Sequence, residues 1–275
     1  MSPAREIALI VERELARNVR SVKGLVLALI CVLGGVGTTL IALGSQRYAT
    51  GKVGGEGLRE LRMEAVSAVY GKAIGKALAD APEVLFVMML GTFALAALLA
   101  ALVGFDTVSA ELQHRAVRYW TVRTRRASYL FGKFLGMFAV ASTMTLLMHV
   151  FSWIAILVKS DIPLSAVLGY GPRLWLFTLP VSAAWCGLVI FFSALLRTPI
   201  IALLLSGLGW VVLAIVHGIA RASDNEPLTW VYPGGFDRLL LHPEPEKWLL
   251  GVGASALFAG LFVGAALLTF QKRDA

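Results

Sequence analysis

The strongest constraint on this chain is a set of six apolar runs, each about twenty residues or longer. They occupy residues 24–43, 84–105, 130–158, 174–196, 200–219 and 248–270. A helix of about twenty residues crosses the roughly 30 Å of hydrocarbon in a bilayer. The chain is 58% hydrophobic and only 15% charged, whereas soluble domains are about one quarter charged. The sequence therefore predicts an all-α integral membrane protein, with residues 1–275 as one six-span transmembrane domain.

The distribution of basic residues predicts the orientation. Six spans place both termini on the same side of the membrane. That side holds 14 of the 25 Lys and Arg residues but only six of the 17 Asp and Glu residues. Because basic loops are retained in the cytoplasm, we expect both termini to be cytoplasmic. The expected location is a plasma membrane, which in a bacterium is the inner membrane.

Residues 1–23 precede the first apolar run and carry charge throughout. Apolar side chains recur within one helical arc, and the arginines lie off that arc. This pattern is typical of a helix that lies in the headgroup plane. We therefore expect an amphipathic interfacial helix over residues 1–23. The apolar arc comprises Ile7, Val11, Leu15, Val19 and Val22.

The loop after the second run, residues 106–129, is the long charged interruption on the basic side. Asp106 and Ser109 can both cap the start of a helix. Leu112, Ala116 and Trp120 then follow at a four-residue step, which predicts one short amphipathic helix.

The polar residues of this loop suggest two roles. Glu111, Arg115 and Arg118 belong to the predicted helix, and a second basic cluster follows it, with Arg123, Arg125 and Arg126. The loop could dock a cytoplasmic protein. Alternatively, its arginines could simply retain it in the cytoplasm and contact anionic lipid headgroups.

The predicted spans lack the Asp, Glu, Lys and Arg side chains that ion-driven carriers use within the membrane. Lys133 is the exception, at an inner edge where its side chain could snorkel to the interface. One face of the third span is polar, and it either lines a substrate path or forms interhelical hydrogen bonds. A stripe of small residues, Ala256, Gly260 and Gly264, predicts close helix packing in the sixth span. The polar face consists of Ser142, Thr145, His149 and Ser152.

As a whole, the pattern resembles the type-2 ABC transporter permeases. The resemblance rests on the amphipathic N-terminal helix, the six spans, the basic loop after the second span and the tail 270–274. In the loop, Ala116 and Val117 stand where the family has Gly-Thr, and Thr124 lies near the expected proline. The positions that match the family's loop pattern are Glu111, Arg126, Gly132 and Lys133.

The resemblance implies a permease subunit of an ATP-driven transporter, an exporter, that is not itself an enzyme. A separate cytoplasmic ABC ATPase would bind ATP and Mg²⁺, and this chain would need no cofactor of its own. Loop 106–129 would act as the coupling helix on that ATPase. The other expected partners are a second permease, identical or homologous, and membrane lipids, with no nucleic acid. The coupling residues would be Glu111, Leu112, Arg115, Ala116, Arg118, Trp120 and Arg126.

A different class of protein fits the same loop. A membrane scaffold that transports nothing could dock a cytoplasmic partner through residues 106–129. The sequence has no nucleotide-binding motif, its four histidines are scattered, and both cysteines lie in apolar runs. It therefore predicts neither a metal centre nor an ATPase site, which leaves the permease and the scaffold as the two interpretations.

Overall fold

The computed structural model describes residues 1–53, 55–223 and 225–272. The last two residues of the tail that supports the family resemblance, Arg273 and Asp274, lie outside them. The membrane-spanning helices are α2 (Val22–Val53), α5 (Glu83–Gly104), α8 (Arg126–Lys159), α9 (Leu164–Leu195), α10 (Pro199–Ala222) and α13 (Pro245–Gln271). The shorter elements are α1 (Pro3–Arg20), α3 (Gly55–Tyr70), α4 (Lys72–Ala77), α6 (Ser109–Gln113), α7 (Val117–Arg123), α11 (Glu226–Thr229), the 3-10 turn η1 (Pro233–Phe236) and α12 (Asp237–Leu240).

Six helices in the described part of the chain are long and apolar enough to cross a membrane, which confirms the predicted fold class. Several helices exceed the apolar runs that predicted them. At 1.5 Å per residue, the 32 residues of α2 and the 34 of α8 extend about 50 Å. Both are therefore long enough to tilt or to project beyond roughly 30 Å of hydrocarbon.

The fourth span begins well before its predicted start. The apolar run begins at residue 174, but α9 begins at Leu164 and continues through Pro172 and Pro180. Proline within a soluble helix usually breaks it, yet prolines are tolerated in membrane helices because neighbouring groups satisfy the freed carbonyls. The start of this helix is therefore set by Pro163 at its N-cap and not by hydropathy.

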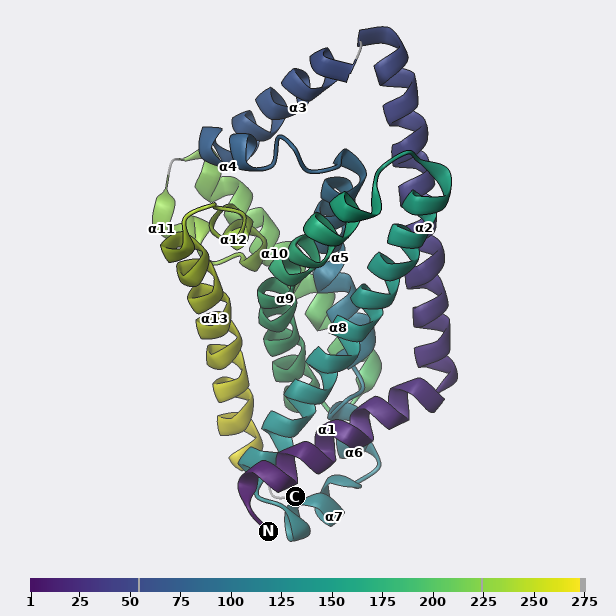
Figure 1. Cartoon of the computed structure of the whole chain (residues 1–275). Coiled ribbons are helices and arrows are strands. Elements are labelled where there is room, and N and C mark those ends of the chain that lie inside the picture. The colour runs from purple at the N-terminus through teal and green to yellow at the C-terminus, as the bar shows by residue number, and fades with distance from the viewer. Residues whose placement is uncertain (54, 224, 273–275) are drawn as a thin grey trace.

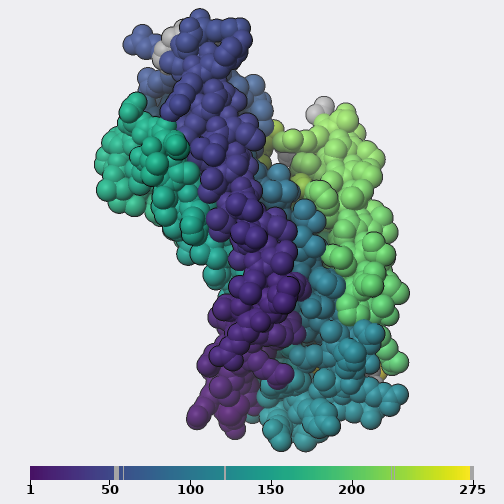
Figure 2. All heavy atoms as spheres, turned by 90° about the vertical axis from the view of Figure 1, so that its right-hand side faces the viewer, coloured from purple at the N-terminus to yellow at the C-terminus, as the bar shows by residue number. Residues whose placement is uncertain are grey.

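Helix α9 lies at the centre of the bundle, where α5, α8 and α13 pack around it (Figure 1). In α5 and in α9, 61% of the most apolar stretch is buried, against 17% in α2 and 11% in α10. Figure 2 looks onto α2, in purple, and α10, in light green, whose outer faces are uncovered. The core of the subunit is thus α5 with α9, and α2 and α10 form its margin.

The two ends of the bundle are different. At one end, termed here the loop end, α1 crosses the base of α8 beside α6 and α7 (Figure 1). At the opposite, far end, α3, α4 and the short elements α11 to α12 cover the bundle. Arg238 donates a hydrogen bond of 2.7 Å to the carbonyl of Val69, which ties α12 to α3.

Candidate docking surface

Loop 106–129 forms two short helices and not the single helix that its apolar spacing predicts. Helix α6 ends at Gln113 and α7 begins at Val117. Between them Arg115 has φ of 57°, in the left-handed region. A right-handed helix cannot continue through a residue in that conformation. The stripe of Leu112, Ala116 and Trp120 is therefore divided between two helices and the turn that joins them.

The predicted helix caps have other partners. Asp106 accepts a hydrogen bond of 2.6 Å from Lys23 at the start of α2, and the hydroxyl of Ser109 donates to the carbonyl of Phe105. A distant residue supplies the cap instead. The hydroxyl of Ser193, at the end of α9, accepts hydrogen bonds from the backbone N–H of Val108 and of Ser109, at 3.0 and 3.1 Å. Helix α6 is thus fixed to α9, which also carries much of the core.

The main anchor of the loop is a buried ion-pair cluster around Lys133. The side chains of Lys133 and Glu14 are each 2% exposed, and the ammonium lies 2.6 Å from Oε1 of Glu14. It also pairs with Oε1 of Glu111, whose Oε2 accepts a 2.8 Å hydrogen bond from the hydroxyl of Tyr129. The expectation that Lys133 snorkels to the interface is wrong. Its charge is compensated by carboxylates of α1 and α6, so it can stay buried.

Helix α1 reaches this cluster because α8 offers two glycines on the face that it crosses. A Cβ atom at Gly132 would lie 2.9 Å from Cβ of Ile10, and one at Gly136 would lie 2.7 Å from Cβ of Glu14. Neither distance accommodates a side chain without displacement of α1. The glycines therefore set the close approach that carries the carboxylate of Glu14 to Lys133.

Polar contacts continue along the buried face of α1. Glu6 is buried, and its carboxylate accepts hydrogen bonds from the side chain of Ser128 and from the backbone N–H of Arg125, the latter at 3.3 Å. These bonds stabilise the charged form and lower the pKa of Glu6 below its ordinary value of 4.5. The end of loop 106–129 is thus held to α1 as well.

Most of the predicted coupling residues face the protein. Glu111 belongs to the Lys133 cluster, and Leu112 packs against the core. The guanidinium of Arg13 lies 4.2 Å from the ring centroid of Trp120, whose ring also packs against that of Tyr129. Arg126 donates a 2.8 Å hydrogen bond to the carbonyl of Gln271, at the end of α13. Ala116 is half-buried in the turn between α6 and α7.

The exposed face of the loop is formed by different residues. Tyr119 is 78% exposed and Val122 86% exposed, and both lie on α7. Arg115 and Arg118 are exposed beside them. These four residues are called the α7 patch below. Sequence reasoning did not single out Tyr119 and Val122, although two apolar side chains among arginines, three residues apart on one helix face, were an available signal.

The polar face of the third span has partners within the subunit. Nε2 of His149 lies 2.9 Å from the hydroxyl of Thr92 on α5. Thr145 accepts a hydrogen bond of 3.2 Å from the indole N–H of Trp175 on α9. The hydroxyl of Ser152 donates to the carbonyl of Met148. Within the described residues, the buried hydroxyl oxygen of Ser142 has no hydrogen-bond partner. Interhelical packing accounts for His149 and Thr145, and their path-lining role stays a prediction.

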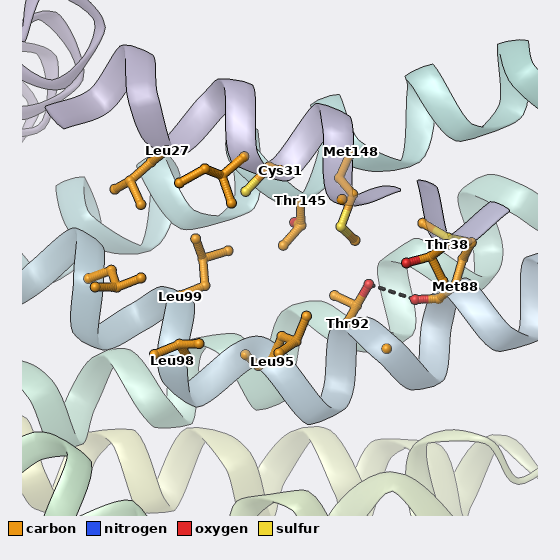
Figure 3. Close-up of a pocket in the computed structure, with 15 residues that line it drawn as sticks. Leu27, Cys31, Thr38, Met88, Thr92, Leu95, Leu98, Leu99, Thr145 and Met148 are labelled. Atoms are coloured by element: carbon orange, nitrogen blue, oxygen red, sulfur yellow. Dashed lines mark hydrogen bonds between the residues drawn. The ribbon is translucent and has the colours of Figure 1, made fainter. Parts of the chain in front are cut away.

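Of these four residues, Thr145 lines a cavity of about 200 Å³ between α2, α5 and α8 (Figure 3). Thr92 also lines this cavity. Its hydroxyl donates a hydrogen bond of 2.9 Å to the carbonyl of Met88, drawn as the dashed line in Figure 3. The remaining walls are mainly leucine and methionine side chains, with Thr38 as the third hydroxyl. The cavity is thus suited to apolar groups and not to ions.

These features define a multi-pass helical membrane protein with a structured loop exposed at one end. Its family follows from the sequence as well as from the fold. The sequence model of the ABC-2 family transporter proteins matches residues 8–234, which is most of the chain, and the chain belongs to that family. It is thus a membrane component of the ABC transporter type. No curated protein matches the sequence.

Proposed function

We propose that this chain is the permease subunit of an ATP-driven exporter and that a separate ABC ATPase docks on the α7 patch. Membership of the ABC-2 family supports the association with an ATPase. Because the sequence has no nucleotide-binding motif of its own, the partner would bind ATP and Mg²⁺. In this arrangement two permeases, identical or homologous, form the membrane part of a bacterial plasma-membrane transporter with cytoplasmic termini.

One observation carries the proposal: the loop exposes an apolar and basic surface while its base is held rigidly. Tyr119 and Val122 are available to fill a groove on a partner, and aromatic and arginine side chains are typical anchors of such interfaces. The opposite face of the loop is bound to Lys133 and, through it, to α1 and α8. A displacement of the α7 patch would therefore move α1 and α8 as well.

The test uses the chain together with the ABC ATPase that copurifies with it. Tyr119→Ala and Val122→Ala should insert normally and weaken ATPase binding. Truncating a central interface anchor costs about 2 kcal/mol, or roughly thirtyfold in affinity. Tyr48→Ala is the matched control, because Tyr48 is also an exposed tyrosine, 67% exposed, but lies on α2 outside the patch. If both patch variants bind the ATPase as tightly as the parent, the docking site is elsewhere.

The scaffold interpretation uses the same surface, and the internal partners of His149 and Thr145 are compatible with it. Transport distinguishes the two. In a permease, ATP hydrolysis by the reconstituted complex responds to substrate, and patch variants reduce transport. In a scaffold, the ATPase or other partner binds, but its turnover does not depend on any transported compound.

A further inference from the structure

An apolar groove of about 700 Å³ runs along the outside of the bundle between α8 and α13 at the loop end. It is called the α8–α13 groove here. Its floor includes Ala183 of α9, and Ile7 of α1 closes one side near the loop end. One wall is aromatic and leucine-rich, with Leu130, Phe131, Phe134, Leu135 and Phe138 of α8. The other is the small-residue stripe of α13, Ala256, Gly260 and Gly264, with Ala259 and Val263 beside it.

The groove exists because α13 packs on α9 through a neighbouring face and not through the stripe itself. A Cβ atom at Gly187 of α9 would lie 2.7 Å from the Cα atom of Ala259, so the two helices are in close contact there. Among the described residues, no atom lies within 4 Å of a Cβ built at Gly260 or Gly264. Within the described residues these two glycines therefore do not pack closely against another helix of the chain, and this wall is open to a ligand.

The length of the groove matches one leaflet of a bilayer. Its α8 wall extends from Ala127 to Phe138, which is about 16 Å at 1.5 Å per residue. Half of the hydrocarbon thickness of a membrane is about 15 Å. A groove that begins at the interface beside Ala127 therefore ends near the bilayer midplane, as a single acyl chain does.

The mouth of the groove is basic. Arg126 precedes Ala127 on α8, and its guanidinium bonds the carbonyl of Gln271, so it joins the two walls at this end. Arg125 and Lys272 are exposed next to it. Among the described residues, Glu6 is the nearby carboxylate, and it already accepts hydrogen bonds from the side chain of Ser128 and the backbone N–H of Arg125. This charge is complementary to the phosphate of an anionic headgroup.

We infer that the α8–α13 groove binds one acyl chain of an anionic phospholipid from the leaflet at the loop end, with the headgroup phosphate between Arg125 and Lys272.

The test uses the full chain in vesicles of phosphatidylcholine with a minor fraction of phosphatidylglycerol that carries a photoreactive acyl chain. After irradiation, lipid adducts are mapped to peptides by mass spectrometry. Adducts should concentrate on residues 127–138 and 256–267 relative to the lipid-exposed face of α10. Gly264→Leu should reduce them to the level of the α10 face, because the leucine side chain would occupy space on this wall that the acyl chain needs. Gly253→Leu is the matched control, because that glycine of α13 also faces open space but lies outside the groove.

The headgroup is tested separately. Arg125→Gln with Lys272→Gln should abolish the preference of the groove for phosphatidylglycerol over labelled phosphatidylcholine, whereas Lys247→Gln, at the far end of α13, should leave it unchanged. Two results would overturn the inference. Equal photolabelling of α10 and the groove would mean that the groove contacts only bulk lipid. Protection of the groove from photolabelling by a second polypeptide would mean that a protein occupies it.

Discussion

Replacing Lys133 with methionine should destabilise the chain more than any single change at its surface. The substitution keeps the length of the side chain but removes the ammonium between Glu14 and Glu111. The side chain of Glu14 is 2% exposed and that of Glu111 12%, so water cannot fully replace the ammonium. Each carboxylate would keep one other partner, Arg17 for Glu14 and the hydroxyl of Tyr129 for Glu111. Removing one partner of a buried ion pair costs about 3–5 kcal/mol. We expect the free energy of unfolding to fall by about that amount.

The assay is reversible unfolding of the purified chain by sodium dodecyl sulfate in mixed micelles, followed by circular dichroism. Lys23→Met is the matched control. Lys23 also pairs with a carboxylate at the loop end, but it and Asp106 are each 28% exposed, and such partly solvated pairs contribute about 1 kcal/mol or less. Comparing the loss of unfolding free energy in Lys133→Met with that in Lys23→Met thus measures the effect of burial and not of lysine removal.

A further variant tests the cause of the loss. Lys133→Met combined with Glu14→Gln and Glu111→Gln has no buried charge left, so it should recover most of the lost stability. The same variant separates binding from coupling. It leaves Tyr119 and Val122 in place, so it should still bind the ATPase. Its transport rate should however depend less on ATP hydrolysis by that ATPase. A free energy of unfolding for Lys133→Met within about 1 kcal/mol of the parent value would contradict this prediction. So would a triple variant that is as unstable as Lys133→Met alone.

Three other outcomes are expected. Impermeant thiol reagents applied to intact cells should label single cysteines, in a variant without native cysteines, at positions 52 and 225 but not at 123 and 197; the reverse would contradict the orientation. Burial raises the pKa of Asp237 above its ordinary 3.8, so the folded chain holds this proton more tightly than the unfolded chain does. The free energy of unfolding should therefore fall as the pH rises from 3.8 through the raised pKa. Asp237→Asn should flatten this pH dependence, measured by hydrogen exchange of residues 233–241. His149→Ala should cost about 1–2 kcal/mol of unfolding free energy through the lost hydrogen bond with Thr92, whereas Ser142→Ala should cost little. A change in transport without a loss of stability would instead favour a substrate path.

The sequence predicted the spans well because hydropathy over twenty residues is a local property of the chain. It predicted the loop contacts poorly because those contacts are not local. Lys133 pairs with Glu14, 119 residues away, and the cap of α6 comes from Ser193, 84 residues after Ser109. A basic residue at the edge of an apolar run looks the same whether it snorkels or meets a buried carboxylate. The helix break at Arg115 was equally invisible, since apolar spacing says nothing of φ.

Helix α1 shows which face of an interfacial helix meets the protein. Its apolar arc predicted a helix in the headgroup plane, and Val19 on that arc is 64% exposed, while Glu14 and Asn18 are buried against α8. In water, burial of the polar face would be unfavourable, but beside hydrocarbon an apolar face needs no protein cover. A carboxylate there is stabilised only by a partner within the protein, which Lys133 provides to Glu14. In a helix at the membrane boundary, the charged residues that lie off the apolar arc are therefore the ones that indicate the protein contact.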